Sequence, residues 1–339
     1  MPSSKLVELV SRYRELGIDN QIDYQKFYLY SIITHSTAIE GSTVTEIENQ
    51  LLFDKGITAK GRTLEEQMMN LDLKKGYERS IELSKLHIPV TIDMLKELSS
   101  LVMKNTGSTY QTVLGSFSTA NGDLRLLNVT AGIGGRSYMS FTKVPACLET
   151  FCNQLNDARQ SLNISSLDDI YDLSFEAHYG LVTIHPWADG NGRMARLLMN
   201  QLQFEYDVIP SKVLKEDKEG YIKSLVQSQE SNNSIFFKNF MRENLCKNLQ
   251  KEIDAFLHST EMGGENVKMG GENGKRGEKT RDIILRHIRN NPNITMSKLA
   301  SVVGISDKAI EKQMARMKKD GVLVRVGPDK GGHWELVHN

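Results

Sequence analysis

Cysteine, tryptophan and proline are scarce in this chain of 339 residues, which contains 3, 2 and 7 of them respectively. The three cysteines (Cys147, Cys152 and Cys246) form no Cys-x-x-Cys motif and cannot all pair, which argues against a disulfide framework and a thiolate metal site. Charge of one sign is not in excess, because Lys plus Arg and Asp plus Glu are equal at 42 each. The whole molecule therefore has no net field that would attract it to a polyanion or a membrane.

Long apolar segments are also missing from the sequence. No run of about 18 apolar residues could span a bilayer, and the first residues lead directly into an amphipathic pattern without the apolar core of a signal peptide. Together with the few cysteines, these absences predict a cytoplasmic protein with no membrane partner. They leave a homo-oligomer open.

Apolar residues at helical spacing fill most of the chain before residue 258. Residues 1–110 are expected to form a helical region that includes a helix near residues 24–41. In residues 111–257, a long apolar stripe runs from Ile170 to Ile184 at helical spacing. The fold class predicted from this pattern is mainly α.

Residues 124–141 break the helical pattern. They contain two short β-type runs, 124–129 and 137–141, and the four residues between 132 and 135 include three glycines. Glycine supplies the positive φ angles that a turn requires. The pattern predicts a β-hairpin, with an irregular surface loop as the alternative.

The composition of residues 258–278, which are polar and rich in glycine, predicts a flexible linker. The sequence Met-Gly-Gly-Glu-Asn occurs in them twice, starting at Met262 and at Met269. Residues 279–339 then predict a compact unit of helices followed by a hairpin.

This last unit resembles a winged helix-turn-helix domain, an α+β fold. Lys and Arg outnumber Asp and Glu in residues 279–337, so the rest of the chain carries the opposite excess. The third predicted helix would be the recognition helix for a DNA major groove. Its basic residues on one face are Lys308, Lys312, Arg316 and Lys319. A solvated charged face on a module that binds a protein partner is the alternative.

The densest polar motif is at residues 185–196, which read His-Pro-Trp-Ala-Asp-Gly-Asn-Gly-Arg-Met-Ala-Arg. The long apolar helix is expected to end at His185 and a new helix to begin near Asn191. The first amides of a helix have no intrahelical partners and carry the positive end of its dipole. Gly190 and Gly192 let a ligand approach these amides closely. The motif therefore predicts a phosphate-binding helix start.

Charged side chains complete the motif. Arg193 and Arg196 are three positions apart on one helix face, so both guanidinium groups could reach the same polyphosphate. Asp189 offers the oxygen ligand that Mg²⁺ prefers, with substrate phosphates completing the shell. His185 has an ordinary pKa of about 6.5, which suits it to take a proton from an attacking hydroxyl. These are the components of phosphoryl-type transfer.

The segment resembles the signature of the Fic (filamentation induced by cAMP) domain, usually His-Pro-Phe-x-Asp/Glu-Gly-Asn-Gly-Arg-x-x-Arg. Every defining polar position matches, and Trp187 stands where Phe is usual, at a position expected to be a buried anchor. The resemblance covers roughly residues 20–250. It implies a Fic-type helical bundle that uses ATP and Mg²⁺ to transfer AMP to Ser, Thr or Tyr of a protein substrate. In this reaction His185 would be the general base and Asp189 the metal ligand.

The same resemblance assigns further residues. Those implied to bind nucleotide are Gly190, Asn191, Gly192, Arg193 and Arg196. Arg196 would hold the γ-phosphate. The hairpin at 124–141 resembles the family's flap, which binds the target segment by strand addition. The flap residues implied to do so are Leu126, Leu127, Asn128 and Val129.

Residues 36–41, Ser-Thr-Ala-Ile-Glu-Gly, resemble the family's inhibitory motif, Ser/Thr-x-x-x-Glu-Gly/Asn. Ser36 and Glu40 would lie near the end of the predicted helix, where Gly41 suits the C-terminus. A carboxylate at Glu40 would pair with Arg196 and withhold it from the γ-phosphate, which predicts self-inhibition. Two alternatives stay open: a DNA-binding transcriptional regulator whose Fic-like core only senses nucleotide, and a Fic enzyme that uses another donor or removes AMP.

Overall fold

The structure, a computed structural model, divides into two compact units, Met1–Phe256 and Leu257–Asn339. The residues that it describes are 2–131, 135, 137–262, 284–285, 288, 292, 294–296, 299–300, 307–319, 321–327 and 333–336. The glycine-rich turn expected at 132–135 falls outside the described residues except for Gly135, and so does the linker from residue 263 onward. None of the helices in this described part has the length and apolarity that a bilayer crossing requires.

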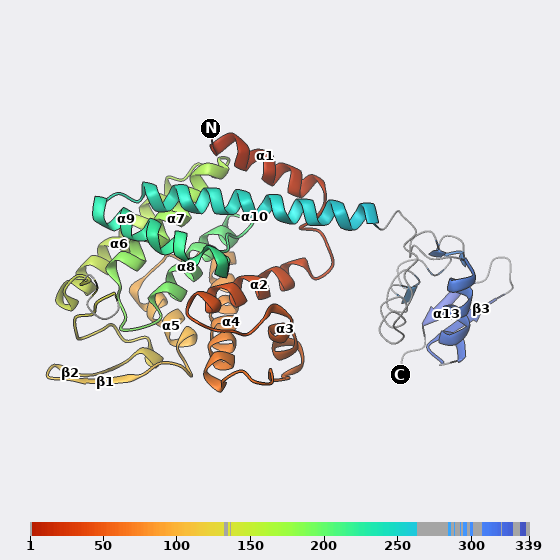
Figure 1. Cartoon of the computed structure of the whole chain (residues 1–339), viewed down its shortest axis with the longest axis horizontal. Coiled ribbons are helices and arrows are strands. Elements are labelled where there is room, and N and C mark those ends of the chain that lie inside the picture. Colours follow the sequence, from red (N-terminus) through yellow and green to blue (C-terminus); the bar gives the residue numbers. More distant parts are fainter. Residues whose placement is uncertain are drawn as a thin grey trace. The chain divides into compact units, whose positions relative to one another are not determined.

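Helices form most of the described first unit, as Figure 1 shows, and the largest non-helical stretch lies between α5 and α6. The α-helices are α1 (Pro2–Glu15), α2 (Tyr24–Ile39), α3 (Glu46–Lys55), α4 (Leu64–Lys85), α5 (Ile92–Val102), α6 (Val144–Gln160), α7 (Leu167–Ile184), α8 (Asn191–Glu205), α9 (Lys218–Ser231) and α10 (Ile235–Met262). Short 3-10 turns are η1 (Thr119–Asn121), η2 (Phe141–Lys143) and η3 (Lys215–Asp217), and the strands are β1 (Thr109–Thr112) and β2 (Gly115–Ser118). The predicted mainly α fold is confirmed.

The centre of this unit is the pair α7 and α8, which flank the 185–196 motif. α8 packs on α7 and α4, and α4 packs in turn on α2 and α5. Met194 and Leu202 of α8 are fully buried. Arg242 of α10 forms ion pairs with Asp168 and Asp172 of α7. The motif is thus held between helices that contact one another along their lengths.

Residues 124–141 do not form the two expected strands, and the prediction of a hairpin there is corrected. In the described residues of this segment, pairing is limited to one antiparallel bridge between Thr130 and Ser137. The guanidinium of Arg125 donates to the carbonyls of Leu127 and Met139, which a regular ladder would otherwise use. The antiparallel hairpin lies earlier in the chain, where β1 pairs with β2.

The predicted linker also begins later than expected, because α10 continues to Met262. Residues 258–262 are therefore helical. No glycine or proline occurs between Ile235 and Met262, and the first glycine of the repeat is Gly263. Nothing in that stretch opposes helix propagation, so the helix continues to the edge of the glycine-rich repeat.

The second unit contains α13 (Asp307–Lys319), β3 (Leu323–Val326) and β4 (His333–Leu336) among its described elements. β3 and β4 are antiparallel, with Leu323 opposite Leu336, as the predicted C-terminal hairpin requires. The apolar face of α13 packs into a buried cluster. Its fully buried members include Ile310, Met314, Met317 and Leu299.

Candidate active site

The 185–196 motif forms a sharp connection between α7 and α8. His185 turns the chain after α7 with a φ of 54°, and Gly190 caps α8 with a φ of 84°. A Cβ on Gly190 would lie 2.6 Å from the sulfur of Met103. Gly190 is required both by its positive φ and by this close approach. The predicted helix end at His185 and helix start near Asn191 are confirmed.

Two buried side chains hold this connection in shape. The side-chain amide of Asn191 donates through Nδ2 to the Trp187 carbonyl at 2.9 Å, and its Oδ1 accepts from the Trp187 backbone N–H at 3.1 Å. Trp187 is fully buried, as expected for an anchor, and its Nε1 donates to the carbonyl of Gly122 at 3.1 Å. The Asn191 side chain therefore closes the loop, and only its backbone amide is left to contribute to the predicted anion hole.

The start of α8 has the form of an anion receptor. Its first intrahelical bond runs from the Met194 N–H to the Gly190 carbonyl at 3.0 Å. The amides of residues 191–193 precede that bond and donate to no backbone carbonyl of the described residues. Such amides and the helix dipole together favour a bound anion.

The carboxylate of Glu40, at the C-terminus of α2, lies over this helix start. A Cβ on Gly192 would be 2.7 Å from Glu40 Oε1. The same oxygen accepts a hydrogen bond from Arg196 Nη2 at 2.5 Å. The Glu40 side chain is about one-third exposed (33%), whereas that of Arg196 is buried. A carboxylate is thus placed where the helix start would receive a phosphate.

Arg196 directs its donors toward α2 and α9. Its Nε donates to Ser36 Oγ at 2.8 Å, and its Nη2 donates to the Ser36 carbonyl at 3.0 Å. Its Nη1 approaches the hydroxyl of Tyr221 at 3.4 Å. Burial disfavours a charged carboxyl at Glu40, but the adjacent guanidinium outweighs burial and holds the pKa of Glu40 below its usual value. Ser36 and Glu40, predicted together as inhibitory, do meet on Arg196.

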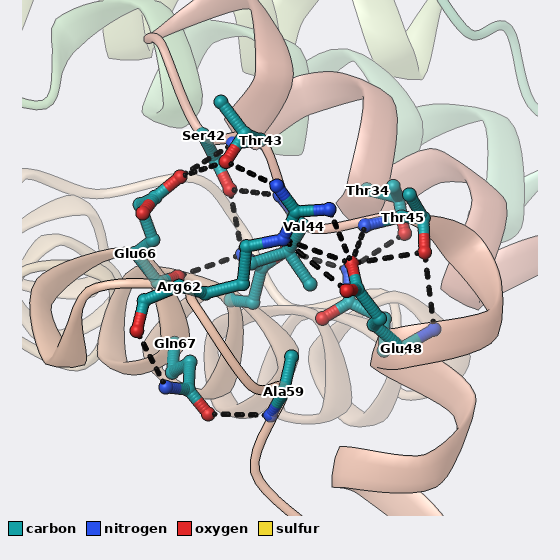
Figure 2. A network of polar contacts seen from close by, with 12 residues as sticks. Thr34, Ser42, Thr43, Val44, Thr45, Glu48, Ala59, Arg62, Glu66 and Gln67 are labelled. Carbon is teal, nitrogen blue, oxygen red and sulfur yellow. Dashed lines mark hydrogen bonds and ion pairs between the residues drawn. The ribbon is translucent and has the colours of Figure 1, made fainter.

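A polar network fixes the segment that follows Glu40 (Figure 2). Glu66 accepts hydrogen bonds from the backbone N–H and the hydroxyl of Thr43, both at 2.6 Å. Arg62 bonds Glu48 through Nε at 3.1 Å and the Thr43 hydroxyl through Nη1 at 3.0 Å. Glu48 and Glu66 also complete the capping boxes at the starts of α3 and α4. The end of α2 is therefore tied to the starts of two other helices.

The imidazole of His185 lies beside the helix start and beneath Tyr138. The two rings stack with centroids 3.6 Å apart at an interplanar angle of 14°. Nδ1 is 3.3 Å from the Val182 carbonyl, so an Nδ1–H donates there and Nε2 carries the basic lone pair. Burial, together with the nearby Arg125 guanidinium, lowers the pKa of His185 to about 4. The imidazole is therefore neutral at neutral pH and able to accept a proton.

Arg193 is buried next to Asp189. Its Nη2 is 3.7 Å from Asp189 Oδ2, while its Nε and Nη1 are buried without a hydrogen-bond partner in the described structure. Unsatisfied buried donors carry a free-energy cost, and a phosphate oxygen is a strong acceptor for a guanidinium. This unsatisfied pair of donors was not predictable from the motif.

The Asp189 carboxylate suits the predicted Mg²⁺ site only in part. It is 60% exposed, and its Oδ1 accepts from the Gly190 N–H at 2.6 Å. Within the described residues no cluster of three or more His, Cys, Asp or Glu could hold a metal alone. One carboxylate fits the way Mg²⁺ binds beside substrate phosphates, which supply the other ligands with water.

The 124–141 segment lies against the site, although not as a strand pair. The Tyr138 N–H donates to the Val129 carbonyl at 3.1 Å, and the Phe141 N–H donates to Asn128 Oδ1 at 3.0 Å. The docking role of Leu126, Leu127, Asn128 and Val129 stays a prediction.

Sequence reasoning missed three residues of this site. Arg125 and Tyr138 contact the His185 segment, and Tyr221 contacts Arg196. Tyr221 also forms a 2.8 Å hydrogen bond with the fully buried His178. An aromatic residue at apolar spacing in α9 looks like ordinary core, so no local signal distinguishes Tyr221.

Comparison with protein families identifies two regions of the chain. Residues 89–203 match the Fic/DOC family, and residues 279–324 match a winged helix-turn-helix DNA-binding family. The first match contains the whole 185–196 motif, and the second contains all of α13.

Similar curated proteins carry the name protein adenylyltransferase. The fic-1 protein of Caenorhabditis elegans is 29% identical over 206 residues, which are 59% of this chain and 36% of that protein. The Fic protein of Nematostella vectensis is 27% identical over 267 residues, which are 77% of this chain and 54% of that protein. The chain thus spans between about one third and about half of the length of these relatives.

Solved structures share the fold. A Fic domain containing signaling protein from Bacteroides thetaiotaomicron has a TM-score of 0.62 and 22% identity, and the match covers 79% of this chain and all of that one. A fragment of Fic-1 from C. elegans has a TM-score of 0.59 and 22% identity, over 76% of this chain and 73% of that one.

Proposed function

We propose that this chain, in which a Fic domain precedes a winged helix-turn-helix domain, transfers AMP from ATP to a Ser, Thr or Tyr hydroxyl of a protein. The observation that carries the proposal is the start of α8. Backbone amides and Arg193 donors that have no partner among the described residues lie there, next to a neutral imidazole. The adenylyltransferase names of the relatives support the same chemistry.

In the proposed reaction, Nε2 of His185 takes the proton of the target hydroxyl. The hydroxyl oxygen then bonds to the α-phosphorus of ATP, the bond between that phosphorus and the bridging oxygen breaks, and pyrophosphate leaves. The amides at the start of α8 and Arg193 stabilise the negative charge that develops on the phosphates. Mg²⁺ held by Asp189 would neutralise charge on the same phosphates. The negative nucleotide would also raise the pKa of His185 and strengthen it as a base.

The proposed restraint on this reaction is the pair formed by Glu40 and Arg196. A γ-phosphate and the Glu40 carboxylate would compete for one guanidinium and for one helix start. While Glu40 holds Arg196 at 2.5 Å, the triphosphate cannot take up the pose that needs that arginine. The restraint lies in the same chain as the catalytic motif, so the proposal requires no separate inhibitor protein.

The direct test incubates wild type, Glu40→Gly and His185→Ala with ATP and Mg²⁺ and measures the mass of this protein and of candidate targets. We expect a gain of one AMP that increases in Glu40→Gly and is absent in His185→Ala. A gain of one phosphate would indicate a different donor orientation. Loss of AMP from a modified target would indicate the reverse activity, and transfer by His185→Ala at the wild-type rate would remove His185 from the mechanism.

The C-terminal unit supports a second proposal, that of binding to duplex DNA. Lys312 and Arg316 are exposed and four positions apart on α13, and a winged helix-turn-helix family matches this region. A pair of exposed cations on one helix face suits contacts with phosphates. Lys308 and Lys319 belong to the same helix, but their side chains lie outside the described residues. A protein partner is the alternative, and a cytoplasmic location fits both.

A further inference from the structure

Arg125 is a buried arginine that the proposed mechanism does not use. Arg125 is only 1% exposed, and its guanidinium donates to three backbone carbonyls. The acceptors are His185 at 2.8 Å from Nε, Leu127 at 2.9 Å from Nη1 and Met139 at 2.6 Å from Nη2. Its backbone N–H donates to the carbonyl of Pro186 at 3.0 Å. The backbone and the side chain of Arg125 thus hold two successive carbonyls of the turn at residues 185–190, the catalytic turn, which carries the proposed base.

The three carbonyls that accept from Arg125 belong to separate parts of the site. Those of Leu127 and Met139 belong to the two arms of the 124–141 segment, and that of His185 belongs to the turn carrying the proposed base. The guanidinium is planar with donors in a fixed fork, so it sets the spacing of the three segments it joins. Met139 directly follows Tyr138, whose ring stacks on the His185 imidazole. The link therefore extends from the 124–141 segment to the ring of the base.

Burial of a guanidinium against neutral carbonyls is unfavourable, and it lowers the pKa of Arg125 below its usual value. An apolar residue of similar size would avoid this cost if the site needed only filling. Only a group with several donors in one plane can satisfy three carbonyls that lie on separate segments. The arrangement of the acceptors thus explains why an arginine stands here.

We propose that Arg125 is a positioning residue that holds the 124–141 segment and the catalytic turn as one unit, and so sets where a target hydroxyl meets His185. The inference deepens the proposed AMP transfer and rests on it for the kinetic outcome alone. The structural outcome is independent of any reaction.

Loss of this link has a measurable effect on the imidazole. Among the described residues, the charged and titratable groups that act on His185 are Arg125, Asp189, Glu40 and Tyr138. Of these, Arg125 lowers the pKa of His185, while Asp189 and Glu40 raise it. When Arg125 is removed, its repulsion disappears and water enters beneath a loosened Tyr138. Both changes raise the pKa of His185 from about 4 toward its ordinary value of about 6.5.

The test compares Arg125→Met, which removes all three donors, with Arg125→Lys, which keeps the charge and cannot reproduce the fork. Arg159→Met is the matched control, because Arg159 is also a largely buried arginine (side chain 9% exposed) and its partners Glu205, Asn156 and Ile88 lie outside the catalytic turn. In full-length protein, the imidazole of His185 is titrated by NMR and exchange of the Tyr138 amide hydrogen is followed. Affinity for ATP is measured separately.

In Arg125→Met we expect the pKa of His185 to rise by at least one unit and the Tyr138 amide to exchange at least tenfold faster. Arg125→Lys should show intermediate values, and it keeps the test usable if Arg125→Met does not fold. Arg159→Met should leave both quantities at wild-type values. Affinity for ATP should change less than about threefold, while kcat/KM for transfer falls on the order of 100-fold, as misplacement of a reacting group predicts.

An unchanged titration and unchanged exchange in a folded Arg125→Met protein would overturn the proposal. So would equal effects in Arg159→Met, because they would reveal a general loss of stability. If the wild type transfers no AMP, the proposed function fails, yet titration and exchange still decide whether Arg125 holds these segments together.

Discussion

Replacement of Glu40 by glycine removes the carboxylate that lies over the start of α8. In the wild type, Arg196 donates to four acceptor atoms of the described residues: one of Glu40, two of Ser36 and one of Tyr221. The substitution deletes only the first. Arg196 then stays close to its position, with its Nη2 and the amides near Gly192 open to the γ-phosphate of a bound nucleotide.

The size of the effect follows from the type of bond that is lost. A hydrogen bond between charged groups contributes about 1.5–3 kcal/mol in proteins. The lower part of this range suits Glu40, because its side chain is about one-third exposed (33%) and water screens the pair. Since about 1.4 kcal/mol corresponds to a factor of ten, the lower part of this range, about 1.5–2.2 kcal/mol, should increase productive nucleotide binding and AMP transfer roughly 10- to 40-fold.

The assay measures transfer of labelled AMP and, independently, ATP affinity by calorimetry. Glu40→Gln retains the shape and loses the charge, so its gain should be intermediate. Glu205→Gln is the control, since it weakens the buried ion pair with Arg159 (2.6 Å) and should leave transfer unchanged. Equal affinity and equal transfer in wild type and Glu40→Gly would refute the competition for Arg196.

Four further predictions concern other parts of the chain. His185→Ala should abolish AMP transfer and change ATP affinity, measured by calorimetry, less than about threefold, because the described contacts of its imidazole are with the Val182 carbonyl and the Tyr138 ring and not with the start of α8. The pKa of His185 is about 4 in the fold and about 6.5 when unfolded, so the unfolded chain binds the proton first and stability falls as pH drops through this window. Between pH 7 and pH 4 the wild type should therefore lose on the order of 2 kcal/mol more unfolding free energy than His185→Ala in chemical denaturation. Trp187→Phe restores the residue usual in the motif but leaves the carbonyl of Gly122 without its indole donor, and thermal unfolding should show a loss of roughly 1–3 kcal/mol. Binding of the chain to duplex DNA should weaken steeply with salt and fall when Lys312 and Arg316 are both changed to Glu; no binding at low salt would favour a protein partner instead.

Local rules explain why the connection between α7 and α8 was predictable. A positive φ at Gly190 and the apolar residues at helical spacing after it both depend on near neighbours in the sequence. The same holds for the end of α2, where Ser36 and Glu40 are one helical turn apart. Their joint approach to Arg196 was suggested by a motif resemblance and not by periodicity.

Contacts over long sequence separations explain what was missed. Arg125 and His185 are 60 positions apart, and no pattern within either segment specifies that one donates to the other's carbonyl. The bonds from Arg125 to the carbonyls of Leu127 and Met139 also explain why the hairpin predicted at residues 124–141 does not form. The β-type composition there is real, but side-chain donors occupy the carbonyls that strand pairing needs. The helical state of residues 258–262 has a simpler cause, because these residues are polar like a linker but contain no glycine or proline that would end α10.

The spacing of Ser36 and Glu40 has a consequence for how the site would respond to a signal. Ser36 and Glu40 lie one turn apart at the end of α2, and both accept hydrogen bonds from the guanidinium of Arg196. A small rotation or slide of α2 would therefore break both contacts together. We expect intermediate degrees of release to be sparsely populated for this reason. Activation should then follow a threshold, with individual molecules either fully restrained or fully open at any moment.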